Sequence, residues 1–324
     1  MKTWSLRTLA LALALLLSAS MVDAQQQPQR GQGQRGQGEG QRGQRSTPPP
    51  NVVRPADQRV PAPFNLETMV RPVAMPDNLW MSELTILEMR DLVKKYGYKT
   101  ALILNGTMES NGPYLTTGKH NHVLKVTGDR IARTLGNTLI APIVMLDSGN
   151  PENVTTPGSI KLSAATLEAV LKDMATSLKG QGFTEIFFLG DSGSNQGTLQ
   201  KVATELSTAW KGKGMLVAHI REYYNYGDVL EYQNKVLGMV ELNKDLDGYH
   251  DDYYISSMIM NDSPKHVRYD ERVKVGLDHI NSLPLKLDQA LDIGKKLAQF
   301  RADVTVTAIN KYRKTGYPAP ATAQ

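Results

Sequence analysis

Four short apolar runs alternate with stretches of helical spacing, and this alternation constrains the fold more than any other feature of the chain. The runs have the length of single buried strands and lie at residues 101–105, 138–145, 185–189 and 215–220. Helical stretches are predicted at residues 82–92, 122–135, 163–180, 196–210, 229–242 and 288–312. Strands that alternate with helices favour βαβ units. The sequence therefore predicts an α/β fold of three layers, α/β/α, around a mostly parallel sheet.

The first apolar run ends in a polar, glycine-rich loop that gathers more chemically capable side chains than any other strand end. This loop contains a carboxylate, Glu109, a rigid corner at residues 111–113, and two histidines, His120 and His122. Open α/β sheets bind their ligands at the carboxyl ends of the strands. The sequence therefore predicts a functional site in the loop.

The composition excludes several classes of site and partner. The 324 residues include no cysteine, which excludes disulfides, thiolate metal ligands and a cysteine nucleophile. The formal net charge is +5, but residues 1–50 carry +4 of it and the remainder of the chain is nearly neutral. The basic balance is therefore no argument for a nucleic-acid partner, and we expect none.

The first 24 residues are typical of a secretory signal peptide. Lys2 and Arg7 precede an unbroken Leu/Ala run at residues 9–17, and residues 22–24 offer small side chains before a cleavage site. The apolar run is shorter than the roughly 20 residues that span a bilayer, so no stable membrane insertion is expected. We expect a mature protein that is periplasmic or secreted, with an uncleaved N-terminal anchor as the alternative.

The next segment has the composition of a disordered spacer. Residues 25–50 are rich in Gln, Arg and Gly and have almost no apolar side chains to bury, and residues 51–75 are rich in proline. We therefore expect residues 25–75 to be disordered and residues 76–324 to form one domain, which is long enough for a substantial core.

Glycines, a proline and a carboxylate in the first loop have the spacing of a known family. Gly106, Glu109, Gly112, Pro113 and Leu115 match the scaffold of a G-x-x-E-x-H-G-P-H-L-P loop that follows a strand. Later matches fall at Gly193, Asn195, His250 and Ser257. In these positions the chain resembles the creatininase (creatinine amidohydrolase) family over residues 76–262. The resemblance implies a creatininase-like α/β/α fold and a homo-oligomer, commonly a hexamer.

The resemblance also implies amide hydrolysis at two divalent metal ions. In that family a bridging water attacks a carbonyl carbon, often in a cyclic amide, and the ions lower the pKa of that water. Of the family's ligand positions, the chain keeps Glu109. Other ligand positions hold Asn111, His120, Ser192 and Ile255. The fold and the metal chemistry must therefore be judged separately.

A remodelled site with one metal ion is the first interpretation. Glu109, His120 and Asp191 would supply two oxygens and one imidazole nitrogen, a ligand set suited to Zn²⁺ or Mn²⁺. Glu109 and His250 are the predicted catalytic residues, with His250 as general acid or base. The predicted contacts to a small amide substrate are Asn111, Ser192 and Asn195. His122 is a spare candidate.

Two other functions remain open at this point. The chain could be a binding protein of the cell envelope that kept the fold and the pocket but lost hydrolysis. It could also be a metal-free hydrolase that uses Ser192, because Gly190-Asp191-Ser192-Gly193 looks like the nucleophile motif of some serine hydrolases. The first interpretation, a metal-dependent amidohydrolase acting on an amide C–N bond, requires Glu109, His120, Asp191 and His250 to meet in one concave site.

Overall fold

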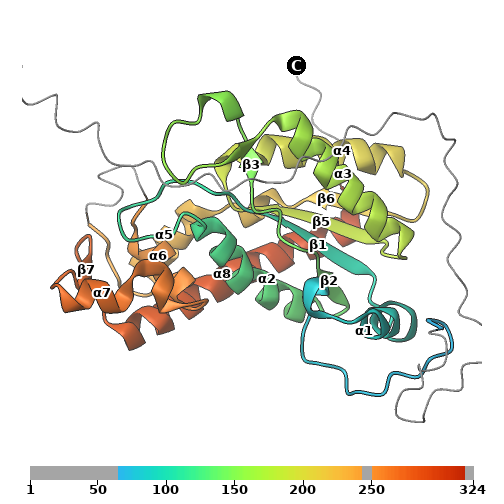
Figure 1. Cartoon of the computed structure of the whole chain (residues 1–324), viewed down its shortest axis with the longest axis horizontal. Helices are drawn as coiled ribbons and strands as arrows, with labels where there is room; N and C mark the ends of the chain where they lie inside the picture. Colours follow the sequence, from blue (N-terminus) through green and yellow to red (C-terminus); the bar gives the residue numbers. More distant parts are fainter. Residues whose placement is uncertain (1–64, 243–249, 318–324) are drawn as a thin grey trace, which may run out of the picture. The chain divides into compact units, whose positions relative to one another are not determined.

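The computed structural model describes residues 65–242 and 250–317. A sheet of four parallel strands lies at its centre, in the order β2-β1-β5-β6 (Figure 1). The strands are β1 (Thr100–Asn105), β2 (Thr138–Ile140), β5 (Glu185–Gly190) and β6 (Leu216–His219). The predicted α/β fold with a mostly parallel sheet is therefore confirmed.

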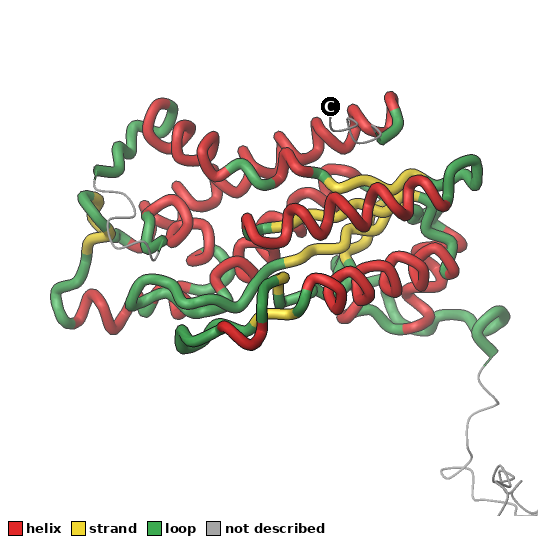
Figure 2. The backbone as a smooth tube through the Cα atoms, turned by 90° about the horizontal axis from the view of Figure 1, so that it is seen from above, coloured by secondary structure: helices red, strands yellow, loops and turns green. Residues whose placement is uncertain are grey.

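Helices cover both faces of this sheet (Figures 1 and 2). One layer consists of α3 (Ala164–Gly180) and α4 (Gln196–Ala209), and the other of α2 (Lys119–Leu135) and α8 (Leu287–Thr315). Because both faces are covered, neither face of the strands is exposed to solvent, and the sequences of the strands are continuously apolar. All six residues of β1 are buried. The three-layer arrangement agrees with the sequence prediction.

The strand order creates a switch point at the carboxyl edge of the sheet. β1 and β5 are direct neighbours, with Asn105 paired with Gly190 at their ends. From β1 the chain passes through α2 to β2 on one side, and from β5 through α4 to β6 on the other. Open α/β sheets bind ligands in the crevice where the strand order reverses in this way. The loop after β1 and the residues after β5 therefore meet at the expected place for a site.

A second apolar core lies beyond this edge, against the N-terminal half of α8 (Figure 1). It is built from α5 (Tyr226–Lys235), α6 (Tyr253–Met260) and α7 (Tyr269–Lys274), with a short hairpin of β7 (His279–Ile280) and β8 (Leu283–Pro284). All eight residues of α6 are buried. A helix that is buried on every side has no amphipathic period, so the sequence pattern did not reveal it.

Two helices begin at positions other than those predicted. The first, α1 (Ile86–Arg90), has Thr85 as its N-cap rather than the predicted Ser82, because Thr85 and Glu88 form a reciprocal capping box. The helix predicted from residue 122 begins at Lys119. Asn121, the predicted cap, instead donates its Nδ2 to the carbonyl oxygens of Thr107 and Met145. The first turn of α2 is thereby tied to the loop that follows β1.

Two elements are shorter than predicted. β2 ends at Ile140 rather than residue 145, since Pro142 has no N–H to donate to a strand neighbour. α5 begins at Tyr226 and ends at Lys235, ahead of Gly238, whose φ of +68° does not continue a helix.

The predicted signal peptide, residues 1–24, and residues 25–64 of the predicted spacer lie outside the described residues. Residues 65–75, which we expected to be disordered, contact the domain. Arg71 lies 3.2 Å from Asp91, measured from Nε to Oδ2, and Met75 packs against the main core. In the part of the chain that the structure describes, no helix is both long enough and apolar enough to cross a membrane.

Gly294 determines how closely α6 and α8 approach. A Cβ atom at this position would lie 1.9 Å from the carbonyl oxygen of Ser257, a backbone atom that cannot swing away. We expect Gly294→Ala to lower the free energy of unfolding by about 2 kcal/mol or more, because it overpacks the interface between the helices. Urea unfolding followed by circular dichroism measures this effect.

Gly197→Ala is the matched control, because a Cβ atom at this helical position in α4 meets no atom within 4 Å. It should leave the free energy of unfolding unchanged or raise it by up to about 1 kcal/mol through helix propensity. Equal effects of the two substitutions would contradict the assigned role of Gly294.

Candidate active site

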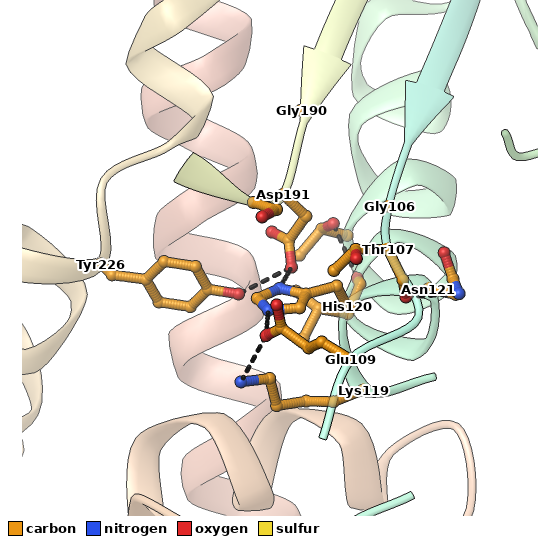
Figure 3. A network of polar contacts seen from close by, with 12 residues as sticks. Gly106, Thr107, Glu109, Lys119, His120, Asn121, Gly190, Asp191 and Tyr226 are labelled. Atoms are coloured by element: carbon orange, nitrogen blue, oxygen red, sulfur yellow. Dashed lines mark hydrogen bonds and ion pairs between the residues drawn. The ribbon is translucent and has the colours of Figure 1, made fainter. Parts of the chain in front are cut away.

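The imidazole of His120 lies between two carboxylates at the carboxyl edge of the sheet (Figure 3). Its Nε2 is 2.6 Å from Oε1 of Glu109, and its Nδ1 is 2.8 Å from Oδ2 of Asp191. Glu109 comes from the loop after β1, His120 from the first turn of α2, and Asp191 from the end of β5. Both ring nitrogens of His120 therefore lie within hydrogen-bond distance of a carboxylate oxygen.

Asp191 is fully buried and is surrounded by donors and positive charge. Its Oδ2 also accepts from the hydroxyl of Tyr226 at 2.7 Å, and its Oδ1 is 2.7 Å from Nη2 of Arg301. Burial alone would raise the pKa of the Asp191 carboxyl, but the Arg301 guanidinium and the His120 hydrogen bond hold it below the usual range. Asp191 is therefore ionised and orients His120.

Arg301 reaches this site from α8 and is itself fully buried. Its guanidinium lies over the rings of Tyr223 and Tyr226, with its Cζ 4.0 Å and 4.3 Å from their centroids. Its Nε donates to the carbonyl oxygen of Tyr223 at 2.9 Å. These contacts hold the charge against Asp191 without access to water.

A second buried cation, Lys119, faces the other carboxylate. Its side chain is 0% exposed, and its Nζ is 3.6 Å from Oε1 of Glu109 (Figure 3). Burial lowers the pKa of Lys119, although nearby carboxylates, Glu109 first among them, oppose this shift. Burial alone would raise the pKa of Glu109, but the hydrogen bond and charge of His120, with the charges of Lys119 and Lys161, lower it to about 2. Glu109 is therefore a stable anion.

These groups border a cavity of about 230 Å³. Of the residues with predicted roles, Glu109, His120, Ser192 and His250 line it, and Asp191 lies behind His120. Tyrosine side chains form much of the remaining wall, namely Tyr224, Tyr226 and Tyr254. His250 adopts a left-handed backbone conformation, with φ of 56°, at this wall. The structure thus brings the predicted catalytic residues to one small concave site.

Two of the three predicted substrate contacts do not line the cavity. Asn195 is fully buried, and its Nδ2 donates to the carbonyl oxygen of Asn105 at 2.9 Å, which braces the ends of β1 and β5. Asn111 donates to the carbonyl oxygen of Glu109 at 3.0 Å and holds the shape of the loop. Both amides thus donate to backbone carbonyl oxygens next to the cavity. Their assignment as substrate contacts is therefore corrected to a structural role.

Ser192 lines the cavity, but its hydroxyl bonds to acidic and hydroxyl groups. It lies 2.8 Å from Oγ of Ser194 and 3.5 Å from Oδ2 of Asp147, whose Oδ1 is 2.8 Å from Nζ of Lys161. His120 has both ring nitrogens committed to carboxylates, so it cannot also activate this hydroxyl. His120 is therefore not the general base that a Ser192 nucleophile would need.

The arrangement does not suit the divalent ion predicted at Glu109, His120 and Asp191. The two carboxylates face different nitrogens of one ring, so the three side chains do not point at a common centre. Two cations with no exposed side-chain surface, Lys119 and Arg301, already neutralise these carboxylates. The negative charges of Glu109 and Asp191 are therefore balanced by side chains of the protein.

Sequence reasoning missed both cations. Neither Lys119 nor Arg301 was singled out from the sequence, because lysine and arginine side chains are usually solvated. One signal could have revealed Arg301. It lies four residues after Leu297 and four before Thr305, on the stripe of α8 whose residues are all buried. An arginine on the apolar stripe of a helix predicts that a buried acidic side chain lies next to it.

Comparisons with known proteins agree with this fold. A family model described as creatininase, creatinine amidohydrolase, matches residues 82–324. The structure "Creatininase Mn" has 16% sequence identity and a TM-score of 0.52, covering 74% of this chain and 98% of that chain. A crystal structure of creatinine amidohydrolase (creatininase) has 14% identity and a TM-score of 0.53, covering 76% and 100%.

A mutant creatininase of the Zn-Zn type has 17% identity and a TM-score of 0.51, covering 74% of this chain and 99% of that chain. No curated protein matches the chain. At these identities the structural likeness establishes the fold alone.

Removal of Arg301 should destabilise the protein strongly. Arg301→Met leaves the Asp191 carboxylate buried without its charge partner, which costs about 3–5 kcal/mol of unfolding free energy. The double variant Asp191→Asn/Arg301→Met should recover part of this loss, because it removes the uncompensated charge. Urea unfolding of the three proteins measures the difference. Lys94→Met, in an exposed pair with Glu67, is the control and should leave the unfolding midpoint nearly unchanged.

The Glu109 carboxyl should make stability depend on pH in the acid range. Its pKa is about 2 in the folded protein against an ordinary value of 4.5. The ionised carboxylate therefore stabilises the fold fully above the ordinary pKa, and this contribution is lost as pH falls through the folded value. The difference in urea midpoint between the wild type and Glu109→Gln should shrink from about pH 5 to about pH 2. A constant difference would argue against an ionised Glu109.

Proposed function

The chain belongs to the creatininase family, and from this premise we propose that its cavity acts on the amide C–N bond of a small molecule without a divalent ion at Glu109, His120 and Asp191. Family membership supports an amidohydrolase-type fold. The observation that carries the finer proposal is the presence of Lys119 and of His120, which lies between two carboxylates, on the wall of one small cavity at the switch point.

Amide hydrolysis requires positive charge where the carbonyl oxygen becomes an oxyanion. Lys119 is among the residues that line the cavity, and its buried Nζ has only the 3.6 Å contact to Oε1 of Glu109, which is longer than a hydrogen bond. We infer that its protons can be donated to the oxygen of a bound ligand. In the proposed reaction Lys119 binds the carbonyl oxygen, and the Glu109 carboxylate accepts from an N–H group of the same amide.

The proton transfers are assigned to the two histidines of the cavity. His120 lies between Glu109 and Asp191 and, in its protonated form, is the candidate acid for the leaving nitrogen. His250 lines the same cavity and is the candidate base for the attacking water, as the sequence predicted. A cavity of about 230 Å³ favours a compact substrate such as a cyclic amide.

One observation favours a second function, binding without turnover. The pKa values of Glu109 and Asp191 are both lowered by neighbouring cations, so neither carboxylate is basic enough to take a proton from water near neutral pH. If His250 does not act as a base, the cavity would bind a small amide and release it unchanged. This is the cell-envelope binding protein considered from the sequence.

We also propose that the protein is exported and forms a homo-oligomer. The predicted signal peptide at residues 1–24 supports action in the periplasm or outside the cell. The resemblance to the family supports a homo-oligomer, with a hexamer as the expected form.

Turnover by the mature protein should be insensitive to chelators and dependent on Lys119. We expect a panel of small amides, namely creatinine, hydantoin, 2-pyrrolidone and formamide, to include a compound that is hydrolysed equally with and without 1,10-phenanthroline. Lys119→Met should lower kcat/KM by about 10²–10³-fold through loss of an oxyanion donor. Product carboxylates are quantified by NMR.

Lys201→Met, which changes an exposed lysine on α4, is the matched control and should retain wild-type turnover. Turnover that is abolished by the chelator and restored by Zn²⁺ or Mn²⁺, with no effect of Lys119→Met, would overturn the proposal. Saturable binding of one of these amides with no product would favour the second function.

A further inference from the structure

A second group of potential metal ligands lies on the other side of the first turn of α2. The Nδ1 of His122 is 2.7 Å from Oδ2 of Asp262, and the Nε2 of His266 is 2.9 Å from the same oxygen. The two imidazole rings stack, with centroids 3.5 Å apart and planes at 17°. Among the residues that the structure describes, these are the only three His or carboxylate side chains whose ligand atoms all lie within 4.8 Å of one another.

Helix geometry explains why two histidines so close in sequence serve different places. Residues two apart on an α-helix are separated by about 200° around its axis. His120 therefore faces the switch-point cavity, and His122 faces the opposite cleft. The sequence analysis named His122 as a spare candidate for the first site. The position of His122 on the helix directs its side chain away from that site.

The other two ligands are held by backbone structure. Asp262 follows the end of α6, and His266 lies in the short 3-10 helix Pro264–Val267, which Ser263 caps by accepting from the N–H of Lys265. The carbonyl oxygen of His266 accepts from the N–H of Thr116 at 3.0 Å, which ties this turn to the loop before α2. The three donors are thus fixed relative to one another before any ligand binds.

The donor geometry suits one transition-metal ion. Nitrogen and oxygen ligands lie about 2.0–2.2 Å from a tetrahedral Zn²⁺, which places neighbouring donors about 3.3–3.6 Å apart. The observed separations of 2.7 and 2.9 Å must therefore open by roughly 0.4–0.9 Å when the ion binds. Two imidazoles that converge on one carboxylate oxygen present their nitrogens to one point, unlike His120, which presents two nitrogens to two points.

The local charges also permit an ion here, in contrast to the switch-point site. The nearest cation is Lys125, whose Nζ is 3.6 Å from Oδ2 of Asp262. Its side chain is 51% exposed and can turn into solvent, whereas Lys119 is 0% exposed and cannot leave Glu109. Binding of a divalent ion therefore needs only the displacement of a surface lysine.

Two of the three ligands face a cleft of about 660 Å³, larger than the switch-point cavity. His122 and Asp262 line it together with Lys125 and Arg130. We propose that His122, Asp262 and His266 bind one divalent transition-metal ion, Zn²⁺ by ligand type, with its remaining coordination positions open to this cleft. Two histidines and one carboxylate that leave positions open form a ligand set found at hydrolytic zinc sites.

The test is zinc binding by the full mature protein, freed of metal with a chelator and titrated with ZnCl₂. Calorimetry and elemental analysis after desalting should give about one zinc per chain in the wild type. His122→Gln and His266→Gln should each weaken zinc binding by at least tenfold. Co²⁺ in place of zinc should give a visible absorption band that the same two variants lose, which reports direct imidazole ligation.

Two controls keep the outcomes separate. His279→Gln changes an exposed histidine and should bind zinc as the wild type does, and Glu109→Gln changes the switch-point site and should also leave zinc binding intact. Thermal melting of each variant in chelator verifies that it folds. Wild-type protein that binds no zinc would overturn the proposal. Zinc that is lost in Glu109→Gln but kept in His122→Gln and His266→Gln would overturn it as well.

Discussion

The buried ion pair between Asp191 and Arg301 is the interaction on which the rest of the sheet edge depends. Both side chains are 0% exposed, so each has lost its hydration, and only their mutual attraction with further hydrogen bonds offsets that cost. His120 and Tyr226 supply those bonds to Asp191, and the rings of Tyr223 and Tyr226 enclose Arg301. Since Arg301 lies in the middle of α8, which contributes to both apolar cores, the pair also joins the sheet edge to the second core.

This pair determines the chemistry of the neighbouring groups. An ionised Asp191 fixes the ring of His120, and the ring in turn fixes Glu109, so one line of charges runs from α8 to the cavity wall. Lys119, which is also buried, ends this line at Glu109. Lys119 and Arg301 thus do for two carboxylates what divalent ions do in a metal centre, which is to neutralise buried negative charge.

Much of the fold could be predicted from the sequence, because covered parallel strands are continuously apolar and helices on a sheet are amphipathic. The meeting of Glu109, His120 and Asp191 followed from the same pattern, since neighbouring parallel strands end at one edge. The roles of Asn111 and Asn195 could not be predicted, because an amide near a strand end looks the same whether it binds a ligand or braces the backbone. Lys119 and Arg301 were missed because burial of a charge depends on partners distant in sequence.

The first turn of α2 separates two kinds of chemistry that a shared metal centre would combine. Lys119 and His120 face the cavity where the amide is proposed to bind, and His122 faces the cleft where zinc is proposed to bind. The direction of the ring nitrogens decides which histidine suits a metal. The two nitrogens of His120 face two separate carboxylates, whereas His122 and His266 face one shared carboxylate oxygen. Side-chain cations at the sheet edge are therefore compatible with a metal ion elsewhere, because the two sites draw on different histidines of the same helix.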